Sequence, residues 1–212
     1  MTKATKQTLI LTSIVCLIPI IAAILLYDQL PNAIATHWGV DGQPNGWSSK
    51  FVGTIVFPGI LLIVNLLFPF LLKIDPKYKN MGNKVKSIVQ WIIPATSLFA
   101  SGITLFSALG ANVRVEIYTP LFMGLLFIII GNYLPKTGQS YTLGIKLPWT
   151  LHDEDNWAKT HRMAGFLWVL CGVLMIISAF FKIRMISMVV LLIVMVIVPC
   201  IYSYLLYAKK NK

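Results

Sequence analysis

Six long stretches of the chain contain no Asp, Glu, Lys or Arg, and each holds 18 to 23 residues. They are Leu9–Tyr27, Phe51–Leu72, Ile88–Leu109, Ile117–Leu134, Met163–Phe181 and Met185–Tyr207. At a rise of about 1.5 Å per residue, a helix of this length crosses a hydrocarbon layer roughly 30 Å thick. A helix also hydrogen-bonds its own backbone N–H and C=O groups, which is needed because lipid tails offer these groups no hydrogen-bond partners. The pattern therefore predicts an all-α integral membrane protein with six transmembrane helices.

Composition supports a membrane protein over a water-soluble one. Hydrophobic residues make up 57% of the chain and charged residues 12%, whereas a soluble domain has about 25% charged residues. The three cysteines, Cys16, Cys171 and Cys200, lie inside apolar runs and form no CxxC pattern. They indicate small packing residues, not a disulfide framework or a zinc site.

The distribution of basic residues predicts the orientation. With the N-terminus inside, 14 of the 18 lysines and arginines fall in cytoplasmic segments and four fall outside. The positive-inside bias therefore predicts an N-in, C-in topology. Orientation also accounts for the net charge of +11, because the basic residues form short clusters between the spans. We expect no direct nucleic-acid partner.

Two connections are long enough to carry a function. Residues 28–50 form an extracytoplasmic loop and residues 135–162 a cytoplasmic loop. We expect two units: residues 1–87, with two helices and the outer loop, and residues 88–212, with four helices and the inner loop. In the inner loop, Thr150 followed by Asp153 approximates a capping box, so a short helix is expected from about Leu151 toward the fifth span.

The outer loop combines turn signals with residues suited to a membrane surface. Asp41-Gly42 and Pro44-Asn45-Gly46 favour turns, and tryptophan suits the boundary between lipid and water. Ser48 or Ser49 is expected to cap the second helix. His37 has no second metal ligand at a credible spacing, so we expect it to act as a hydrogen-bonding group. The loop predicts a compact platform on the bilayer surface.

Two alternatives to a binding protein come from the polar residues. The first is a small multi-spanning transporter of a peptide or small molecule. Ion-coupled transporters keep charged groups at membrane depth, and the six runs hold no charged residue and no histidine, which weakens the transporter class without removing it. One face of the third helix serves either as a close helix contact or as a polar path, through Ser97, Ser101, Thr104 and Ala108.

A membrane enzyme is the second alternative, resting on His152, His161 and the inner-loop acids. HExxH is absent, and the acidic residues Asp153, Glu154 and Asp155 are explained by a helix start. No nucleophile is paired with His161. We therefore expect no catalytic residue, no metal and no cofactor.

The two loops resemble known sequences. HWGVDGQPNGWSSK resembles the first-loop signature of a bacterial membrane domain of unknown function. GNYLPKTGQSYTLGIKLPWTLHDEDNWAKTHRMAG is similar to the hallmark segment of the SdpI family of immunity proteins, and the resemblance spans nearly the whole chain. The sequence departs from the pattern at Ala35, where a proline is usual, and at Lys146-Leu147, where Arg-Thr is common. The second departure weakens any role that needs a bidentate arginine.

The resemblance implies a multi-pass protein of the bacterial cytoplasmic membrane that protects its cell from a secreted antimicrobial peptide toxin. It also implies a possible partner, a cytoplasmic transcriptional repressor held at the bilayer. The expected toxin-facing residues are His37, Trp38, Gly42, Pro44, Asn45, Trp47 and Lys50. The expected cytoplasmic switch residues are Asn132, Pro135, Gly144, Lys146, Pro148, Trp149, Thr150, Trp157, Thr160 and His161. A purely structural role, in which the inner motif only locks the fourth and fifth helices together, remains open.

Overall fold

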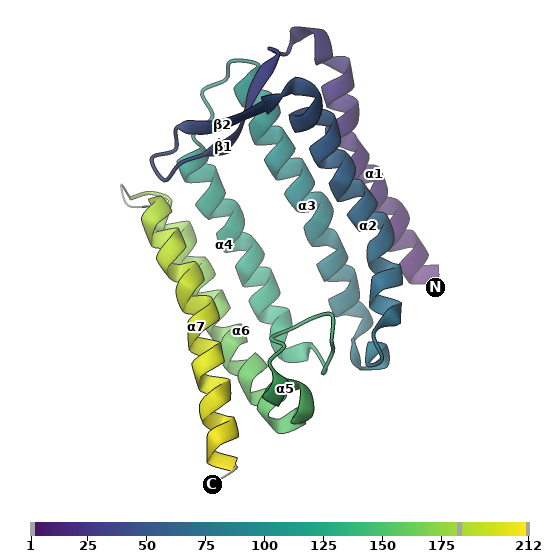
Figure 1. Cartoon of the computed structure of the whole chain (residues 1–212), viewed down its shortest axis with the longest axis vertical. Coiled ribbons are helices and arrows are strands. Elements are labelled where there is room, and N and C mark those ends of the chain that lie inside the picture. The colour runs from purple at the N-terminus through teal and green to yellow at the C-terminus, as the bar shows by residue number, and fades with distance from the viewer. Residues whose placement is uncertain (1–2, 182–183, 211–212) are drawn as a thin grey trace. The chain divides into compact units, whose positions relative to one another are not determined.

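A computed structural model describes residues 3–181 and 184–210, and most of them are helical (Figure 1). The helices are α1 (Lys3–Leu25), α2 (Phe57–Ile74), α3 (Asn83–Ala108), α4 (Val115–Tyr133), α5 (Pro148–His152), α6 (Glu154–Ser178) and α7 (Arg184–Lys210). The strands are β1 (Ala33–Trp38) and β2 (Pro44–Ser49). Short 3-10 turns cover Tyr27–Gln29, Tyr78–Asn80 and Leu134–Lys136, and a π-helical turn covers Val52–Val56.

The six expected membrane spans are confirmed within the described residues. Each is a helix long and apolar enough to cross a bilayer, and only 17 to 39% of its most apolar stretch is buried inside the protein. Large apolar side chains face outward instead, among them Leu25 at 76% and Phe166 at 74% exposure. Such surfaces are excluded from water, so lipid is their natural surrounding. The face on which each connection lies stays a prediction, and Lys182 and Lys212, which entered the charge count, lie outside the described residues.

The structure adds a feature to the outer segment and corrects one local expectation in the inner segment. Most of residues 28–50 forms the hairpin of β1 and β2, which the sequence did not predict. The short inner helix is α5, which begins at Pro148 and includes Leu151. It does not continue into the membrane, because Asp153, and not Thr150, caps the helix that does, α6. The Asp153 carboxylate accepts hydrogen bonds from the backbone N–H groups of Asp155 and Asn156, at 3.0 and 3.2 Å, so α6 begins there without a break before the span.

The chain divides into two compact units, and each is described by itself. Unit 1 comprises residues 1–70 and 87–116 and holds α1, the hairpin and most of α2 and α3. Unit 2 comprises residues 71–86 and 117–212 and holds the inner connections with nearly all of α4 and α5 to α7. The division expected from the sequence, into residues 1–87 and 88–212, stays a prediction.

Small residues line the buried interior of unit 1. Ala23, Leu30 and Leu105 pack together. Ser97 and Ser101 are 0% and 1% exposed, and their hydroxyls have no hydrogen-bond partner among the described residues. Their burial matches the close-contact interpretation of this face, in which small side chains let helices approach.

Glycines bring α4 and α6 together in unit 2. A Cβ added at Gly131 would lie 2.8 Å from the carbonyl oxygen of Gly165, and one added at Gly165 would lie 2.7 Å from that of Gly131. Gly124 and Gly172 approach each other in the same reciprocal way. Contacts this short leave no room for a side chain, so the two backbones touch at both points.

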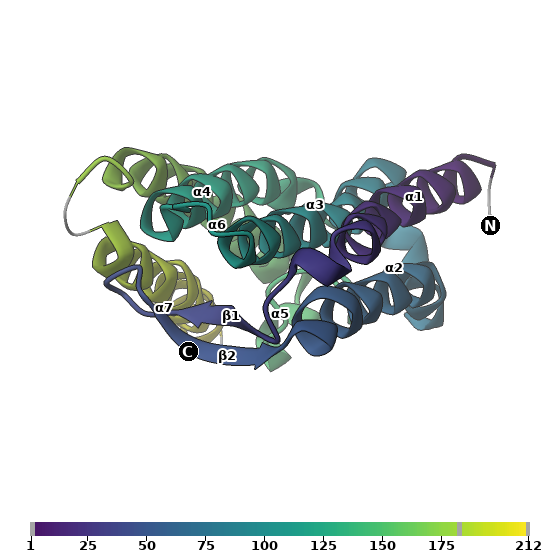
Figure 2. The same ribbon diagram turned by 90° about the horizontal axis from the view of Figure 1, so that it is seen from above.

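In the same unit α6 and α7 lie side by side (Figure 2). Their contact is made by larger and more flexible side chains. Cys171 and Met175 of α6 pack with Met195 of α7. The indole N–H of Trp168 donates to the carbonyl of Met195 at 3.0 Å. Methionine adapts its shape readily, so this contact is softer than the glycine contact.

Candidate functional site

The outer motif folds into an antiparallel hairpin in unit 1. Ala33 pairs with Ser49 and Trp38 with Pro44, and a register irregularity falls beside His37. Gly42 closes the turn with a φ of +77°, a conformation that glycine adopts without strain. Asp41-Gly42 thus does mark the turn, whereas Asn45-Gly46 lies within β2. The alternation that would reveal the strands is short and is interrupted by the bulge.

One side of the hairpin is packed against unit 1. Ile34 is 1% exposed, and a Cβ at Gly53 would lie 2.6 Å from its Cδ1 atom, so Gly53 is where the hairpin meets the chain leading into α2. The Ser49 hydroxyl accepts the N–H of Val52 at 3.3 Å, which confirms its expected capping role. The ammonium of Lys50 lies 4.5 Å from the ring centre of Tyr27 and donates to its carbonyl at 3.4 Å. These contacts position the hairpin and leave the Lys50 ammonium engaged.

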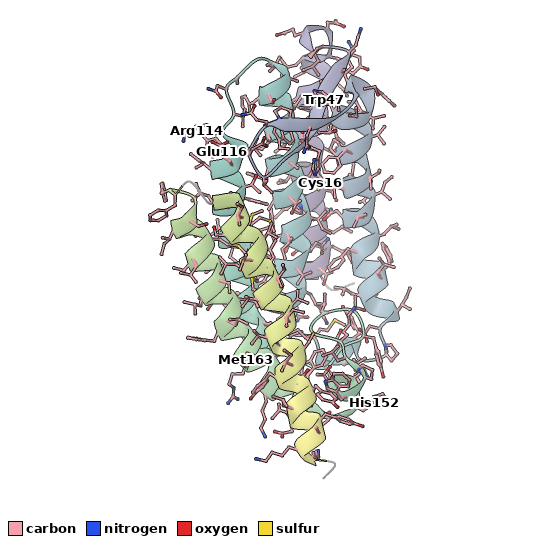
Figure 3. The ribbon with its side chains drawn as sticks, turned by 60° about the vertical axis from the view of Figure 1, so that its left-hand side comes forward. Cys16, Trp47, Arg114, Glu116, His152 and Met163 are labelled. Atoms are coloured by element: carbon pink, nitrogen blue, oxygen red, sulfur yellow. The ribbon has the colours of Figure 1, made fainter. Side chains whose placement is uncertain are left out.

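The other side of the hairpin is open. Trp47 on β2 is 61% exposed (Figure 3). The ring Nδ1 of His37 pairs with the Oδ1 atom of Asn45 across the hairpin, as expected of a hydrogen-bonding histidine. The Glu116 side chain, paired with Arg114 at 3.6 Å, lies against the turn, because a Cβ at Gly42 would approach its carboxylate at 2.9 Å. The exposed groups of this surface are an indole, an amide and an imidazole.

The inner motif of unit 2 is a network centred on Asp75, which sequence reasoning missed. One carboxylate oxygen of Asp75 accepts from the Ser140 hydroxyl and the Thr142 N–H, both at 2.8 Å, and the other accepts from the Lys77 N–H at 2.8 Å. Burial opposes ionisation of this carboxyl, but the Ser140, Lys77 and Thr142 hydrogen bonds outweigh it and hold the pKa of Asp75 below its usual range. The segment after α2 is thereby tied to the loop after α4.

Lys77 extends the same network to α5. Its ammonium donates to the Gln139 amide oxygen at 2.5 Å and to the Leu151 carbonyl at 3.2 Å. The amide nitrogen of Gln139 donates to the Thr150 carbonyl at 2.9 Å. The Thr150 hydroxyl accepts the N–H of Leu147 at 2.9 Å and donates to the Ile145 carbonyl at 2.8 Å. Thr150 thus fastens the start of α5 from inside, as its 0% exposure requires.

His161 is a buried structural anchor in this arrangement. Its Nε2 atom accepts the N–H of Ile145 at 2.9 Å, so the proton is on Nδ1, which donates to the Trp157 carbonyl at 2.8 Å. The ring stacks on Trp157 with 3.9 Å between centroids. Gly144, at φ +106°, passes so close that a Cβ would lie 2.5 Å from the His161 Nε2 atom. Both ring nitrogens are therefore engaged in hydrogen bonds to the backbone.

Trp149 connects α5 to the end of α7. Its indole N–H donates to the Ser203 hydroxyl at 3.0 Å, and its ring stacks on Tyr207 with centroids 5.8 Å apart. Asn156 adds a second link from α6, donating to the Ser203 carbonyl at 2.9 Å and accepting from the Thr160 hydroxyl at 3.0 Å. The inner ends of α5, α6 and α7 are therefore joined by polar groups with defined partners.

The structure brings together only part of the expected switch set. Gly144, Thr150, Trp157 and His161 form one cluster, with Trp149 and Thr160 in the neighbouring links described above. The exposed members of the set have local roles: Asn132 donates to the Ile128 carbonyl, Lys146 donates to the Thr142 carbonyl, Pro135 packs on Gly165, and Pro148 begins α5. The partners that were missed are Asp75, Lys77, Gln139, Ser140, Asn156 and Ser203.

A recess of ≈460 Å³ opens beside this network in unit 2. Trp157, Gln139 and Gly138 line it, together with the charged Lys136 and Glu154. Gly138 is needed because a Cβ there would collide with the Asn80 carbonyl. Across residues 3–181 and 184–210, no group of three His, Cys, Asp or Glu side chains is placed to hold a metal. The recess offers hydrogen bonds and one charge of each sign to a partner.

Comparisons with known proteins match both motif regions. Residues 136–203 match the SdpI/YfhL protein family, and residues 14–62 match a domain of unknown function, DUF1648. A protein of Bacillus subtilis (strain 168) described as "Immunity protein SdpI" is 30% identical over 208 residues, which cover 97% of this chain and 98% of that protein. No solved structure matches the chain.

Proposed function

The chain belongs to the SdpI/YfhL family, and on this premise we propose that it is a membrane immunity protein. It protects the cell that makes it from a secreted, membrane-active peptide toxin. One observation carries the proposal: the similarity to an immunity protein runs over 97% of the chain and includes both motif regions. The six apolar spans place the protein in the membrane that such a toxin attacks.

The open side of the hairpin is the proposed toxin-facing surface. Trp47 offers a large apolar area with a hydrogen-bond donor, and the His37–Asn45 pair offers polar edges beside it. An amphipathic peptide arriving at a bilayer presents apolar and polar groups together, and an exposed tryptophan is a common energetic centre for such contacts. The packed side, through Ile34 and Gly53, holds this surface in place.

The inner network is the proposed switch. After the hairpin, the π-helical turn Val52–Val56 and α2 follow without interruption, and α2 ends at Ile74, directly before Asp75. A toxin that binds one arrangement of the hairpin and α2 more tightly than another shifts the population toward that arrangement. Asp75 then carries the shift to the loop around Gly144 through Ser140 and Thr142.

The proposed cytoplasmic partner is a transcriptional repressor that binds when toxin is present. The recess beside Trp157 and Gln139 is the surface that would hold it, because its lining combines an apolar ring with donors, acceptors and charges of both signs. The receptor function is an addition to immunity, and the two are tested separately.

Immunity is tested by challenging cells that carry or lack the protein with a panel of secreted peptides, reading membrane potential. We expect carriers to keep their potential against at least one peptide that depolarises the other cells. Trp47→Ala should lose this protection, while Trp91→Ala, at a tryptophan that is 40% exposed on α3, should keep it. Equal depolarisation of carriers and non-carriers by every peptide would refute immunity, and equal protection by both variants would refute the hairpin surface.

The receptor role is tested with a photo-crosslinking amino acid at Lys136, in the recess. We expect toxin-treated cells to give an adduct with a DNA-binding protein, and untreated cells to give little. The same amino acid at Lys73, an exposed position in the last turn of α2, is the control. An adduct that forms equally without toxin, or equally at Lys73, would contradict the proposed switch.

A further inference from the structure

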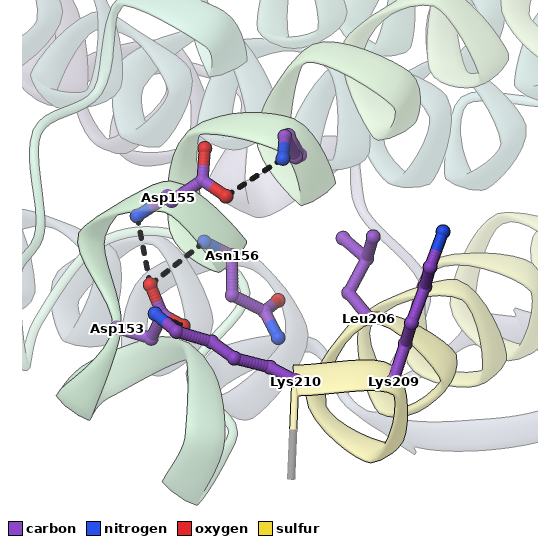
Figure 4. A pocket seen from close by; sticks show the side chains of 7 residues that line it. Asp153, Asp155, Asn156, Leu206, Lys209 and Lys210 are labelled. Atoms are coloured by element: carbon purple, nitrogen blue, oxygen red, sulfur yellow. Dashed lines mark hydrogen bonds and ion pairs between the residues drawn. The ribbon is translucent and has the colours of Figure 1, made fainter. Parts of the chain in front are cut away.

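A second recess, of ≈370 Å³, lies where the start of α6 meets the end of α7 in unit 2 (Figure 4). Three lysines line it: Lys159, Lys209 and Lys210. The carboxylates of Asp153 and Asp155 lie beside them, and Leu206 supplies an apolar wall. The recess is separate from the Asp75 network and from the recess beside Trp157, and the proposed function does not use it.

The recess has one more lysine than it has carboxylates, so one positive charge has no partner within it. Lys210 donates to Asp153 at 2.8 Å, and Asp153 also caps α6, so this pair is committed to the fold. Lys159 pairs with Asp155 at 2.7 Å, but both side chains are more than half exposed, so the pair is weak and exchangeable. Lys209 forms no ion pair within residues 3–181 and 184–210, and in Figure 4 it extends away from Asp153. Three lysines against two carboxylates match a ligand of one negative charge.

Aromatic side chains mark this end of α7 as a membrane boundary, independently of charge. Trp149 contacts Tyr204 and Tyr207, with ring centroids 5.6 and 5.8 Å apart. Tyr204 and Tyr207 are 52% and 43% exposed. Tryptophan and tyrosine concentrate at the level of lipid headgroups, and Lys209 and Lys210 follow within one helical turn. The recess therefore lies where headgroups lie.

An exposed apolar stripe leads along α7 to the recess. Ile193, Ile197, Ile201 and Leu205 recur every four residues, so they share one face, and each is about half exposed or more. Such a stripe accepts an extended hydrocarbon chain. A ligand that uses both features has an apolar tail and an anionic head.

We propose that this recess binds the phosphodiester of an anionic phospholipid, with Lys159 and Lys209 contacting the phosphate and one acyl chain lying along the α7 stripe. Asp155 competes with the phosphate for Lys159. Removal of the Asp155 charge therefore strengthens binding, and removal of the two lysines weakens it. A zwitterionic lipid, which carries no net charge, binds less well.

The test is a lipid titration of the purified full chain in detergent, read by native mass spectrometry, with phosphatidylglycerol and phosphatidylcholine of the same acyl chains. A lysine beside an anionic lipid surface contributes about fivefold in affinity, so Lys159→Gln with Lys209→Gln should weaken phosphatidylglycerol binding about 30-fold. Lys73→Gln with Lys84→Gln removes the same charge from exposed positions elsewhere and should leave binding unchanged. Asp155→Asn should tighten binding several-fold, a gain that misfolding cannot produce.

Three results would overturn the proposal. The first is an equal loss in both double variants, which would indicate a general charge effect. The second is equal affinity for the two lipids. The third is displacement of phosphatidylglycerol by inorganic phosphate at comparable concentration, which would assign the recess to a free anion with no use for the stripe.

Discussion

Replacement of Gly144 with alanine tests the central contact of the inner network. Gly144 has a φ of +106°, which side chains adopt only under strain. An added Cβ would also lie 2.5 Å from the His161 Nε2 atom and 2.8 Å from the ring of Trp157. The backbone must move to relieve this clash, and that movement separates the Ile145 N–H from His161.

The cost has two parts. A non-glycine residue in this region of φ costs about 1–2 kcal/mol. Loss of the Ile145 hydrogen bond leaves the buried Nε2 atom of His161 without a partner, which costs about 1–3 kcal/mol more. Gly144→Ala should therefore destabilise the protein by about 2–5 kcal/mol.

Thermal or SDS unfolding of the purified protein, followed by tryptophan fluorescence, measures this cost. Gly110→Ala is the matched control, because Gly110 has a φ of +84° but nothing within 4 Å of an added Cβ. Gly110→Ala therefore has the backbone strain of a positive φ but no steric clash of the new Cβ. Gly59→Ala, at an open helical position of α2, has neither the strain nor the clash. If Gly144→Ala is no more destabilising than Gly110→Ala, the argument that Gly144 is held against His161 is wrong.

Three further substitutions test other contacts. The low pKa of Asp75 stabilises the fold above about pH 4, and this contribution is lost as the pH falls through the folded pKa. Asp75→Asn should therefore remove the part of the stability loss below about pH 4 that Asp75 causes, and parallel unfolding profiles of variant and parent in that range would contradict this. Gly131→Ala should cost about 1–3 kcal/mol in the same unfolding assay, because its Cβ would meet the Gly165 carbonyl at 2.8 Å; a stability equal to that of the parent would exclude the close approach. Trp149→Phe removes the hydrogen bond to Ser203 and should cost about 1 kcal/mol, whereas adding Ser203→Ala to the Trp149→Phe variant should cost little more if that bond is the main link.

The spans could be predicted from sequence because lipid imposes a simple rule on them. A segment must be apolar and long enough to cross the bilayer. The runs that begin at Leu9 and Met163 meet this rule by their own composition, whatever the rest of the chain contains. The shared helical face of Ser97 and Ser101 was also visible in the sequence. It allowed a close helix contact or a polar path, and the burial of both residues matches the close contact. These are local properties.

The inner network could not be predicted because its bonds are distant in sequence. Asp75 meets Ser140 across 65 residues, and Trp149 meets Ser203 across 54. A signal for Asp75 was present, since it is the acidic residue within the otherwise basic connection that follows α2. Nothing in the sequence indicated which residues bind Asp75. The family resemblance pointed to His161, but only the fold shows which groups its ring hydrogen-bonds.

The hairpin was missed for a different reason. In β2, Trp47 is the one residue of the β-branched or aromatic types that mark strands, and Pro44, Asn45 and Gly46 favour turns. Packing of Ile34 against Gly53 outweighs these local preferences. Tertiary contact decides the conformation here.

The two glycine contacts between α4 and α6 have a mechanical consequence. They lie seven residues apart on each helix, about 10 Å along the axis. If α4 slid along α6 by one helical turn, a side chain of one helix would collide with the backbone of the other. We therefore expect α4 and α6 to move as one rigid pair. The contact between α6 and α7 is more adaptable, because Met175 and Met195 can change their side-chain conformations as α7 moves. Movement within this unit is therefore expected to displace α7 relative to α6, while α4 and α6 keep their positions relative to each other.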